Sequence, residues 1–226
     1  MEKAFGVSST IASNTKLKNG YTIYEWVVRK KCFPRFWGRS LMGETPLQSE
    51  EIDFLRKNKC KIALMLDNLS EVKVSSSNGS DDAIKAIAAA TALGVPANNK
   101  KVIFANIHAD WSINHNWMIS FAQTLSSGGY IPGFIGNTDS SLNFNFDRQY
   151  SHYIEATQNQ KNFNALLGAT EPKFYCEPEE WKPYCPSALQ PEDIQLWETD
   201  SIIFDASVVD ILYAKKLHIL NHFWGG

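Results

Sequence analysis

The fold class is decided by one stretch of this sequence, SDDAIKAIAAATALGVP at residues 80–96, with the run VIFANI at residues 102–107 behind it. The stretch begins with a serine and two acidic residues, which are favoured at the amino-terminal end of a helix. The alanine-rich segment Ala83–Leu93 has high helix propensity, and Gly94 and Pro96 predict where that helix ends. The apolar run that follows is continuous, which is typical of a strand covered on both faces. The sequence here therefore predicts a helix followed by a buried strand.

The same alternation of helical patterns and short apolar runs extends along most of the chain. Apolar runs predict strands at Ala4–Ser8, Phe36–Ser40, Lys61–Leu66, Val102–Ile107, Tyr130–Ile135, Ala165–Ala169, Ile194–Trp197 and Ser201–Asp205. Helices are predicted at Tyr21–Lys30, from Ser49 onwards, at Ala83–Leu93, at Trp117–Leu125 and at Val208–Lys216. This alternation indicates a parallel sheet with covering helices, but it does not choose between a closed barrel and an open doubly wound sheet. No glycine-rich phosphate loop follows any of these strands, which argues against a nucleotide-binding sheet.

The size and charge of the chain limit what it can be. Its 226 residues are 44% hydrophobic and 20% charged, which suits one domain over residues 1–226 with a substantial core. The formal net charge of −2 gives no reason to expect nucleic acid as a partner. No run of about 18 apolar residues exists, so we expect no transmembrane segment. The segment Met1–Phe5 lacks the apolar centre of a signal peptide, so we expect either a cytoplasmic protein or a mature domain with an added methionine.

The cysteine and histidine residues do not predict a metal site, and we expect no cofactor. The four cysteines have no CxxC spacing, which argues against zinc. His108, Asp110 and His115 lie near one another in the sequence, but their spacing matches no standard metal motif. Cys176 and Cys185 enclose a short proline-rich loop, so a disulfide between them is an alternative if the domain is exported.

Several blocks of the sequence, taken in order, resemble one known family. The blocks are FWGR at residues 36–39, LQSEE at 47–51, GSDDA at 79–83 with Ala86 and Ala90, LGVP at 93–96, and GFIG at 133–136. Together they look like the bacterial glycoside-hydrolase-like domains first catalogued as a domain of unknown function, which are distant relatives of the family 25 glycoside hydrolases, the muramidases. The matching blocks cover about residues 5–140, with a short further piece near 201–210.

The resemblance implies a TIM-type (β/α)8 barrel, with irregular carboxyl-terminal units and with its site at the carboxyl ends of the strands. It also implies acidic residues at three places. The first follows a glycine on strand one, where this sequence has Ser8. The second is a pair of acids after strand four, where His108 replaces the first acid and Asp110 provides the second. The third is an aspartate at the end of the last strand, where Asp205 fits.

These residues are the candidates for catalysis. Glycoside cleavage needs two carboxyl groups flanking the scissile bond, one protonated and one ionised, and Asp110 and Asp205 are the candidate pair. His108 is a candidate general acid or base near neutral pH. In the alternative interpretation the site has lost its activity. His108 then has only a structural, hydrogen-bonded role, and Asp110 caps the helix near Trp111. Asp205 is equally interpreted as the amino-terminal cap of the helix Val208–Lys216.

Four further residues are candidates for substrate binding because they lie at or after the ends of predicted strands. Asp67 follows the third strand, and Asn137 follows the fifth. Trp111 lies next to the strand-four candidates and offers an aromatic face on which a sugar ring can stack. Arg39, at the end of strand two, either binds substrate or neutralises a carboxylate. Because burying an unpaired charge is costly, we expect Arg39 to have an acidic partner.

Three functions remain open at this point. The first is a barrel that binds peptidoglycan glycan or another polysaccharide with a weak or inactive hydrolytic site, which the missing acids at Ser8 and His108 favour. The second is an active, muramidase-like hydrolase that uses Asp110 and Asp205. The third is a non-catalytic structural or interaction domain of a larger protein. The resemblance implies an extracellular or cell-wall location.

Overall fold

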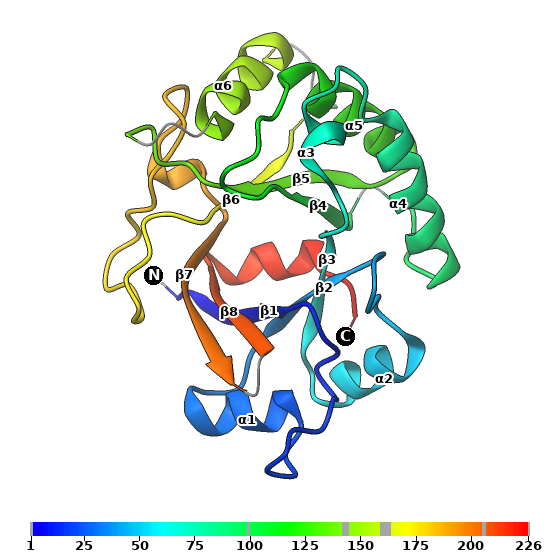
Figure 1. Cartoon of the computed structure of the whole chain (residues 1–226), viewed down its shortest axis with the longest axis vertical. Helices are drawn as coiled ribbons and strands as arrows, with labels where there is room; N and C mark the ends of the chain where they lie inside the picture. The colour runs from blue at the N-terminus through cyan, green and yellow to red at the C-terminus, as the bar shows by residue number, and fades with distance from the viewer. Residues whose placement is uncertain (1, 99, 142–144, 159–163, 205–206, 226) are drawn as a thin grey trace.

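Eight strands close into one barrel in the computed structural model, which describes residues 2–98, 100–141, 145–158, 164–204 and 207–225 (Figure 1). The strands are β1 (Ala4–Ser9), β2 (Phe36–Ser40), β3 (Lys61–Leu66), β4 (Val102–Asn106), β5 (Ile131–Gly136), β6 (Leu166–Ala169), β7 (Leu196–Phe204) and β8 (Ser207–Ala214). They follow one another around the ring in chain order, and β8 closes the ring against β1. The predicted α/β class is confirmed, and the sheet is closed rather than open.

The barrel is mixed because its last strand runs against both of its neighbours. Each pair of neighbours from β1–β2 to β6–β7 is parallel, whereas β8 is antiparallel to β7 and to β1. Only residues 205–206 separate β7 from β8, so these two strands form a hairpin. The reversal brings the start of β8 to the same end of the barrel as the carboxyl ends of the seven parallel strands.

Helices cover the outside of the barrel along the connections between β1 and β6 (Figure 1). They are α1 (Ile23–Lys30), α2 (Ser49–Lys57), α3 (Glu71–Val74), α4 (Ser80–Ala92), α5 (His115–Ser127) and α6 (Phe146–Thr157), and the 3-10 helices are η2 (Pro191–Asp193) and η3 (Leu217–His222). The helix predicted within residues 80–96 is present as α4, and Gly94 beyond it adopts the left-handed conformation with a φ of 78°. The helical patterns of the sequence also predict α1, α2 and α5, but not α6.

Alternation along each strand separates two hydrophobic layers. The layer inside the barrel is narrow and contains Ala4, Phe36, Ala63, Met65, Val102, Phe104, Ile135, Leu196, Leu212 and Ala214. The layer between strands and helices contains the alternate residues of the same strands, such as Val7, Trp37 and Leu64, together with the buried faces of the helices. The residues of each strand that are in phase with this inner layer therefore point into the barrel.

Two glycines make room for aromatic rings inside this narrow barrel. A Cβ atom on Gly6 would lie 2.3 Å from the ring of Phe36, and one on Gly133 would lie 2.4 Å from the ring of Phe104. Any side chain at either position would displace the facing ring. The inward positions of β1 and β5 therefore require glycine.

The segment after β8 closes the amino-terminal end of the barrel with apolar rings. The ring of Phe223 lies 4.9 Å from that of Phe36 and 6.3 Å from that of Phe104. Trp224 then pairs with Ile62 through two backbone hydrogen bonds of 2.7 and 2.8 Å. This segment forms a floor, so the open end of the barrel is the end to which the carboxyl ends of the parallel strands point.

The carboxyl-terminal part of the chain differs from the sequence prediction. The helix predicted at Val208–Lys216 is wrong, because Ser207–Ala214 form the strand β8. Its inward residues Asp210, Leu212 and Ala214 alternate with the outward residues Val209, Ile211 and Tyr213, which is the period of a strand. Pairing with β7 and β1 on both sides then fixes the strand. The two strands predicted at Ile194–Trp197 and Ser201–Asp205 correspond to the single strand β7.

The four cysteines are free thiols. Cys176 is exposed, while Cys185 is half-buried with its sulfur 3.6 Å from the carbonyl oxygen of Leu189. The disulfide considered between Cys176 and Cys185 is therefore absent from the structure. Within the described part of the chain, the helices are too short or too polar to cross a membrane.

Candidate active site

The inward positions at the open end of the barrel are polar. One step beyond the apolar inner layer, the alternation leads to Ser8, Ser40, Asp67, Asn106, Asn137, Thr170 and Glu198, one from each of the first seven strands or from the residue that follows it. The reversed strand β8 adds Asp210, which lies opposite Ser8 of β1 and Ser201 of β7. Three of these side chains are carboxylic acids, namely Asp67, Glu198 and Asp210, and we call them the inner acids.

Glu198 is the inner acid whose proton affinity departs furthest from normal. Its side chain is only 15% exposed, and Lys173 from the loop after β6 places its Nζ atom 2.8 Å from Oε1. Burial is the largest influence, and together with the negative charges of Asp210 and Glu171 it raises the pKa of Glu198 to about 7, against the opposing effect of Lys173. A general acid that works near neutral pH needs a pKa in this range.

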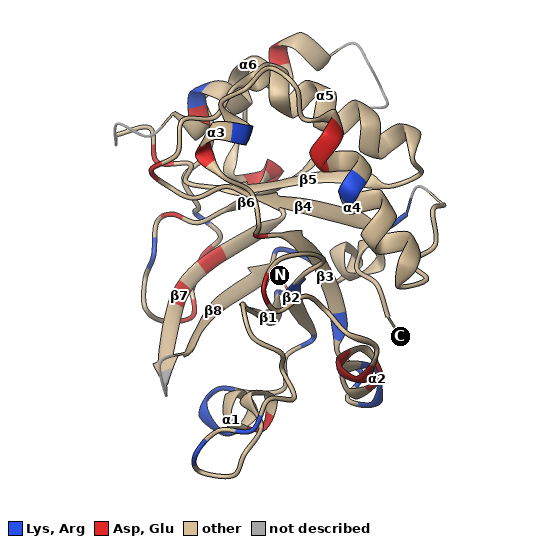
Figure 2. Cartoon of the chain, turned by 45° about the vertical axis from the view of Figure 1, so that its right-hand side comes forward, with Lys and Arg blue, Asp and Glu red and all other residues tan. Residues whose placement is uncertain are grey.

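Asp210 is held in place by hydroxyl groups on the two neighbouring strands. The Oγ atom of Ser201 donates a hydrogen bond of 2.8 Å to Oδ1, and the Oγ atom of Ser8 donates one of 3.4 Å to Oδ2. Each oxygen of the carboxyl group therefore has its own donor. These two contacts fix the carboxyl group on the inner face, from where its charge acts on Glu198. Figure 2 shows acidic residues in red, among them a position on β7.

Asp67 directly follows β3 and is bound to the neighbouring strands. Its Oδ1 atom accepts a hydrogen bond of 3.0 Å from Nδ2 of Asn106, and its backbone N–H donates to Oγ of Ser40 over 3.3 Å. The residue is exposed to solvent at the open end of the barrel, yet the protein atoms around the carboxyl group partly desolvate it and raise its pKa. The charge of Asp210 acts in the same direction, so these two acids influence each other across the barrel.

Arg39 points the other way, into the layer between strands and helices. It is fully buried, and its Nε atom lies 2.9 Å from both carboxylate oxygens of Glu51 on α2. Its terminal nitrogens donate hydrogen bonds of 2.8 Å to the carbonyl oxygens of Ser9, Thr10 and Thr45. The expected acidic partner is therefore Glu51. These contacts connect the loops after β1 and β2 to α2. Arg39 therefore stabilises the barrel wall and does not lie with the inner acids.

His108 and Asp110 lie in the loop after β4, and we call them the outer pair. Both side chains are 68% exposed, and Nδ1 of His108 is hydrogen-bonded to Oδ1 of Asp110. The imidazole ring of His108 lies 5.7 Å from the ring of Trp111, which is half-buried. The sequence-derived candidates His108, Asp110 and Trp111 are thus neighbours in space, but in solvent and on a loop.

Asn137 and Asp205 complete the candidates from the sequence. Asn137 follows β5 and is buried, and its Oδ1 atom accepts a hydrogen bond of 2.9 Å from the backbone N–H of Asp139. Asp205 lies outside the described residues. The helix that it was expected to cap is replaced by β8. The structure therefore brings Asp67 and Asn137 to the open end of the barrel, and it leaves the proposed pairing of Asp110 with Asp205 without a measured geometry.

Glu198 and Asp210 were missed by reasoning from the sequence, although the sequence contains a signal for both. Glu198 follows Leu196 at a spacing of two, and Asp210 precedes Leu212 and Ala214 at the same spacing. An acid in phase with the inward residues of a strand is costly to bury, so it marks a candidate functional position. For Asp210 that signal is visible only if residues 208–214 are recognised as a strand, and for Glu198 only if the predicted strand Ile194–Trp197 is continued beyond Trp197.

Two solved structures share this fold. An uncharacterized protein of B. stearothermophilus superposes with a TM-score of 0.80 and 21% identity, covering 98% of this chain and 100% of that chain. The Mycobacterium tuberculosis Tat-secreted protein Rv2525c, solved in complex with HEPES, superposes with a TM-score of 0.60 and 13% identity, covering 94% of this chain and 96% of that chain. At these identities the likeness establishes the fold alone. No family model matches the chain, and no curated protein matches it.

Proposed function

We propose that this protein is a glycoside-hydrolase-like barrel that binds a cell-wall or other polysaccharide and hydrolyses it with the inner acids. The observation that carries the proposal is the contrast between two adjacent carboxyl groups. Burial raises the pKa of Glu198 to about 7, whereas Asp210 has a hydroxyl donor at each of its oxygens. Two carboxyl groups in environments that differ in this way are the arrangement that acid-assisted glycoside cleavage needs.

The proposed roles follow from these environments. Glu198 donates its proton to the glycosidic oxygen as the bond from that oxygen to the anomeric carbon breaks. The carboxylate of Asp210 stabilises the positive charge that develops on the sugar ring, and a water molecule adds to the anomeric carbon and gives its proton to the carboxylate of Glu198, which restores the acid. Asp67 and Asn137, at the same end of the barrel, are placed to bind sugar hydroxyls.

The structure offers a physical explanation for Ser8, where this chain departs from the pattern of the muramidase-related family. That family implies an acid at this position on strand one, and this chain has serine there instead. Asp210 lies directly opposite Ser8 in the β1–β8 register and accepts its hydrogen bond. We infer that the negative charge has moved to the neighbouring strand, so the serine does not by itself imply a lapsed site.

The proposal extends to the type of barrel and to the place where the protein works. We propose that the fold is a variant of the TIM-type (β/α)8 barrel in which the last strand is reversed. We also propose that the protein acts on glycans outside the cytoplasm, as the muramidase-related family implies. One structural neighbour is described as a Tat-secreted protein, which supports this location.

A second candidate function is glycan binding without hydrolysis. The ion pair between Lys173 and Glu198 favours it, because an ammonium group 2.8 Å from the carboxylate stabilises the ionised form that cannot donate a proton. In the hydrolytic proposal, burial outweighs this effect. The two functions therefore differ in one measurable property, which is whether Glu198 carries a proton when glycan is bound.

Turnover of defined substrates separates the two functions. The wild-type protein is incubated with peptidoglycan and with soluble neutral oligosaccharides, and new reducing ends are measured. We expect turnover that is lost in Glu198→Gln and Asp210→Asn but retained in Asp110→Asn, the matched carboxylate in the outer pair. Binding of the same oligosaccharides without turnover would establish the second function, and turnover that depends on Asp110 instead would overturn the assignment of the inner acids.

A further inference from the structure

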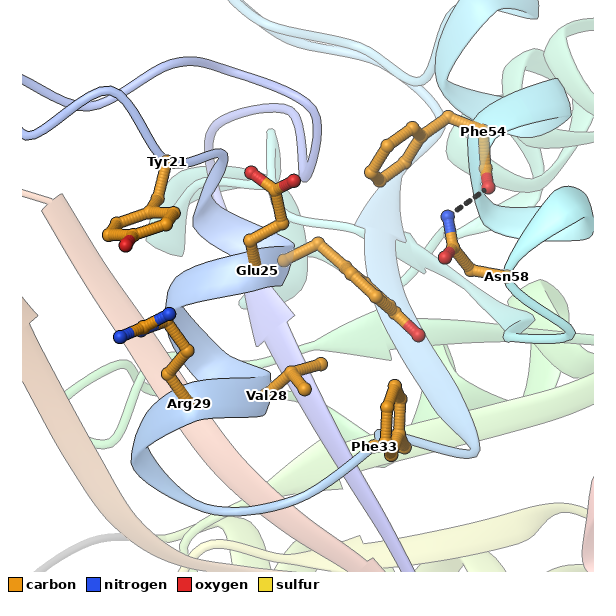
Figure 3. A pocket seen from close by; sticks show the side chains of 8 residues that line it. Tyr21, Glu25, Val28, Arg29, Phe33, Phe54 and Asn58 are labelled. Carbon is orange, nitrogen blue, oxygen red and sulfur yellow. Dashed lines mark hydrogen bonds between the residues drawn. The ribbon is translucent and has the colours of Figure 1, made fainter.

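A pocket lies on the outside of the barrel, between α1 and α2. It has a volume of about 320 Å³, and it is lined by Tyr21, Tyr24, Glu25, Val28, Arg29, Phe33, Phe54 and Asn58. Figure 3 shows Glu25, Val28 and Arg29 projecting from α1, Phe54 and Asn58 coming from α2, and Phe33 lying in the segment that leads to β2. The inner acids face the interior of the barrel, so this pocket is separate from the proposed active site.

The aromatic lining of this pocket is partly fixed and partly exposed. The ring of Tyr24 is buried and packs edge-on against Phe54, with 5.6 Å between the ring centroids. Phe33, in contrast, is 70% exposed, and Tyr21 is 37% exposed. A phenylalanine ring that is mostly in water contributes little to the fold, whereas it offers a large apolar face to a ligand.

The polar lining carries both signs of charge and is held in place. Thr22 at the start of α1 donates hydrogen bonds from its backbone N–H and its hydroxyl group to the carboxylate of Glu25, over 2.7 and 3.0 Å. The guanidinium group of Arg29 lies over the ring of Tyr21, 4.6 Å from its centroid. Asn58 is anchored by a hydrogen bond of 2.8 Å from Nδ2 to the carbonyl oxygen of Phe54.

This combination determines which ligand chemistry fits. The lining has one carboxylate, that of Glu25, and one guanidinium group, that of Arg29, so the pocket has no net charge that would select an anion or a cation. A neutral ring with several hydroxyl groups satisfies both, because each hydroxyl group donates to a carboxylate and accepts from a guanidinium or amide group. The apolar face of such a ring packs against an exposed aromatic side chain. Pyranose sugars have this structure.

We propose that the pocket between α1 and α2 is a secondary glycan-binding site that takes a neutral sugar unit. The proposal rests on the proposed function, because it supplies a second point of attachment for the same class of polymer. Attachment at a second site raises the local concentration of the polymer at the barrel and strengthens binding of long chains more than of short ones.

The test measures binding in a background that cannot turn the glycan over. Calorimetric titration of Glu198→Gln with a neutral chitin hexasaccharide is compared with titration of the double variants that add Phe33→Ala, Phe33→Trp or Ile84→Ala. Ile84 is an exposed apolar residue on α4, with 55% exposure, so it is the matched control. We expect affinity at the secondary site to fall about tenfold with Phe33→Ala, but to be retained with Phe33→Trp and with Ile84→Ala.

The possible outcomes keep this inference distinct from the proposed function. Loss of binding with Phe33→Ala in a protein whose wild type shows no turnover would support the glycan site and reject the hydrolase. Hexasaccharide binding that does not change with Phe33→Ala would overturn the inference, whatever the turnover. The inference would also be overturned if the pocket bound a proline-rich peptide or a polygalacturonate oligomer more tightly than the hexasaccharide, and if Phe33→Ala abolished that binding. Either result would contradict a neutral sugar as the ligand.

Discussion

The inner acids and the outer pair lie on the same barrel, yet they differ in the properties that catalysis depends on. Glu198 is 15% exposed and has a pKa raised to about 7, whereas Asp110 is 68% exposed and is bonded to a histidine in solvent. Glu198 and Asp210 project from strands whose pairing fixes their direction, while Asp110 lies in a loop. The comparison teaches that the phase of a residue within its strand decides which acid enters the barrel. Closeness to a strand end in the sequence does not decide it, because Asp67 and Asp110 both follow strands and only Asp67 is an inner acid.

Removing one acid from each group should separate the inner acids from the outer pair most clearly. We expect Glu198→Gln to lower the rate of glycan hydrolysis by about a thousandfold, since a general acid commonly contributes a factor of about 10² to 10⁴. Asp110→Asn should change the rate less than threefold. Steady-state rates on one soluble oligosaccharide at pH 6 provide the measurement. Equal losses in the two variants would remove the distinction between the groups.

The next largest effect separates Arg39 from the inner acids. Arg39→Met leaves Glu51 as a buried, unpaired carboxylate, so we expect the free energy of unfolding to fall by about 3–5 kcal/mol. Asp53→Asn is the control, because Asp53 is the 81% exposed partner in a surface ion pair, and such pairs contribute at most about 1 kcal/mol. Urea denaturation followed by circular dichroism measures both. A stable Arg39→Met protein that no longer binds glycan would instead place Arg39 in the site.

The proton affinity of Glu198 predicts how stability depends on pH. The pKa rises from an ordinary value of 4.5 when the chain is unfolded to about 7 when it is folded. The folded state therefore binds more protons between these values, and the free energy of unfolding falls as pH rises through this window. The loss contributed by Glu198 is at most about 3 kcal/mol. Urea titrations at pH 4.5 and pH 8 should show a smaller fall in Glu198→Gln than in the wild type.

A smaller effect concerns Lys173, which we regard as a positioning residue for Glu198. Replacing Lys173 with methionine removes the ammonium group that favours the ionised carboxylate, so the pKa of Glu198 should rise further. The alkaline limb of the rate profile would move to higher pH by the same amount. Lys173→Arg keeps the charge and should restore the original limb. An unchanged pH profile in Lys173→Met would show that Lys173 has no influence on the acid.

The smallest expected effect lies beside the outer pair. Trp111 is half-buried against His108, and part of its ring is accessible to a glycan chain that extends out of the barrel. We expect Trp111→Ala to weaken glycan binding about threefold, less than 1 kcal/mol. The affinity is measured in the Glu198→Gln background. Complete loss of binding would show that recognition is centred on the loop after β4, as the sequence alone suggests.

Local signals explain which parts of this fold could be predicted from the sequence. The helix α4 and the strand β4 have strong propensities and clear ends, so residues 80–107 could be assigned without any knowledge of their neighbours. The partner of Arg39 could be expected because a buried guanidinium group needs an acid. The strand β8 could not be assigned, because its conformation depends on pairing with β7 in a hairpin and with β1, which lies about 200 residues away in the sequence.

The error in β8 also accounts for the error in the site. If residues 208–216 are interpreted as a helix, nothing places the side chain of Asp210 inside the barrel. Glu198 then falls between the two short strands predicted at Ile194–Trp197 and Ser201–Asp205. With the strands in place, both acids share a face with known inner residues. The candidate site was therefore only partly predictable: Asp67 and Asn137 were found from strand ends, whereas Asp210 was hidden by the wrong helix and Glu198 by the division of β7 into two short strands.

The reversed strand has a consequence for how this chain folds. The barrel closes when β8, which pairs residue by residue from Ala4 to Ser9 of β1, arrives between the first and seventh strands. Until that moment the edge of β1 and the outer edge of the β7–β8 hairpin are open, and the floor around Phe223 is missing. Contacts between residues so far apart form slowly, and open edges attract other chains. Refolding should therefore succeed in dilute solution and give way to aggregation as the concentration of partly folded chains rises.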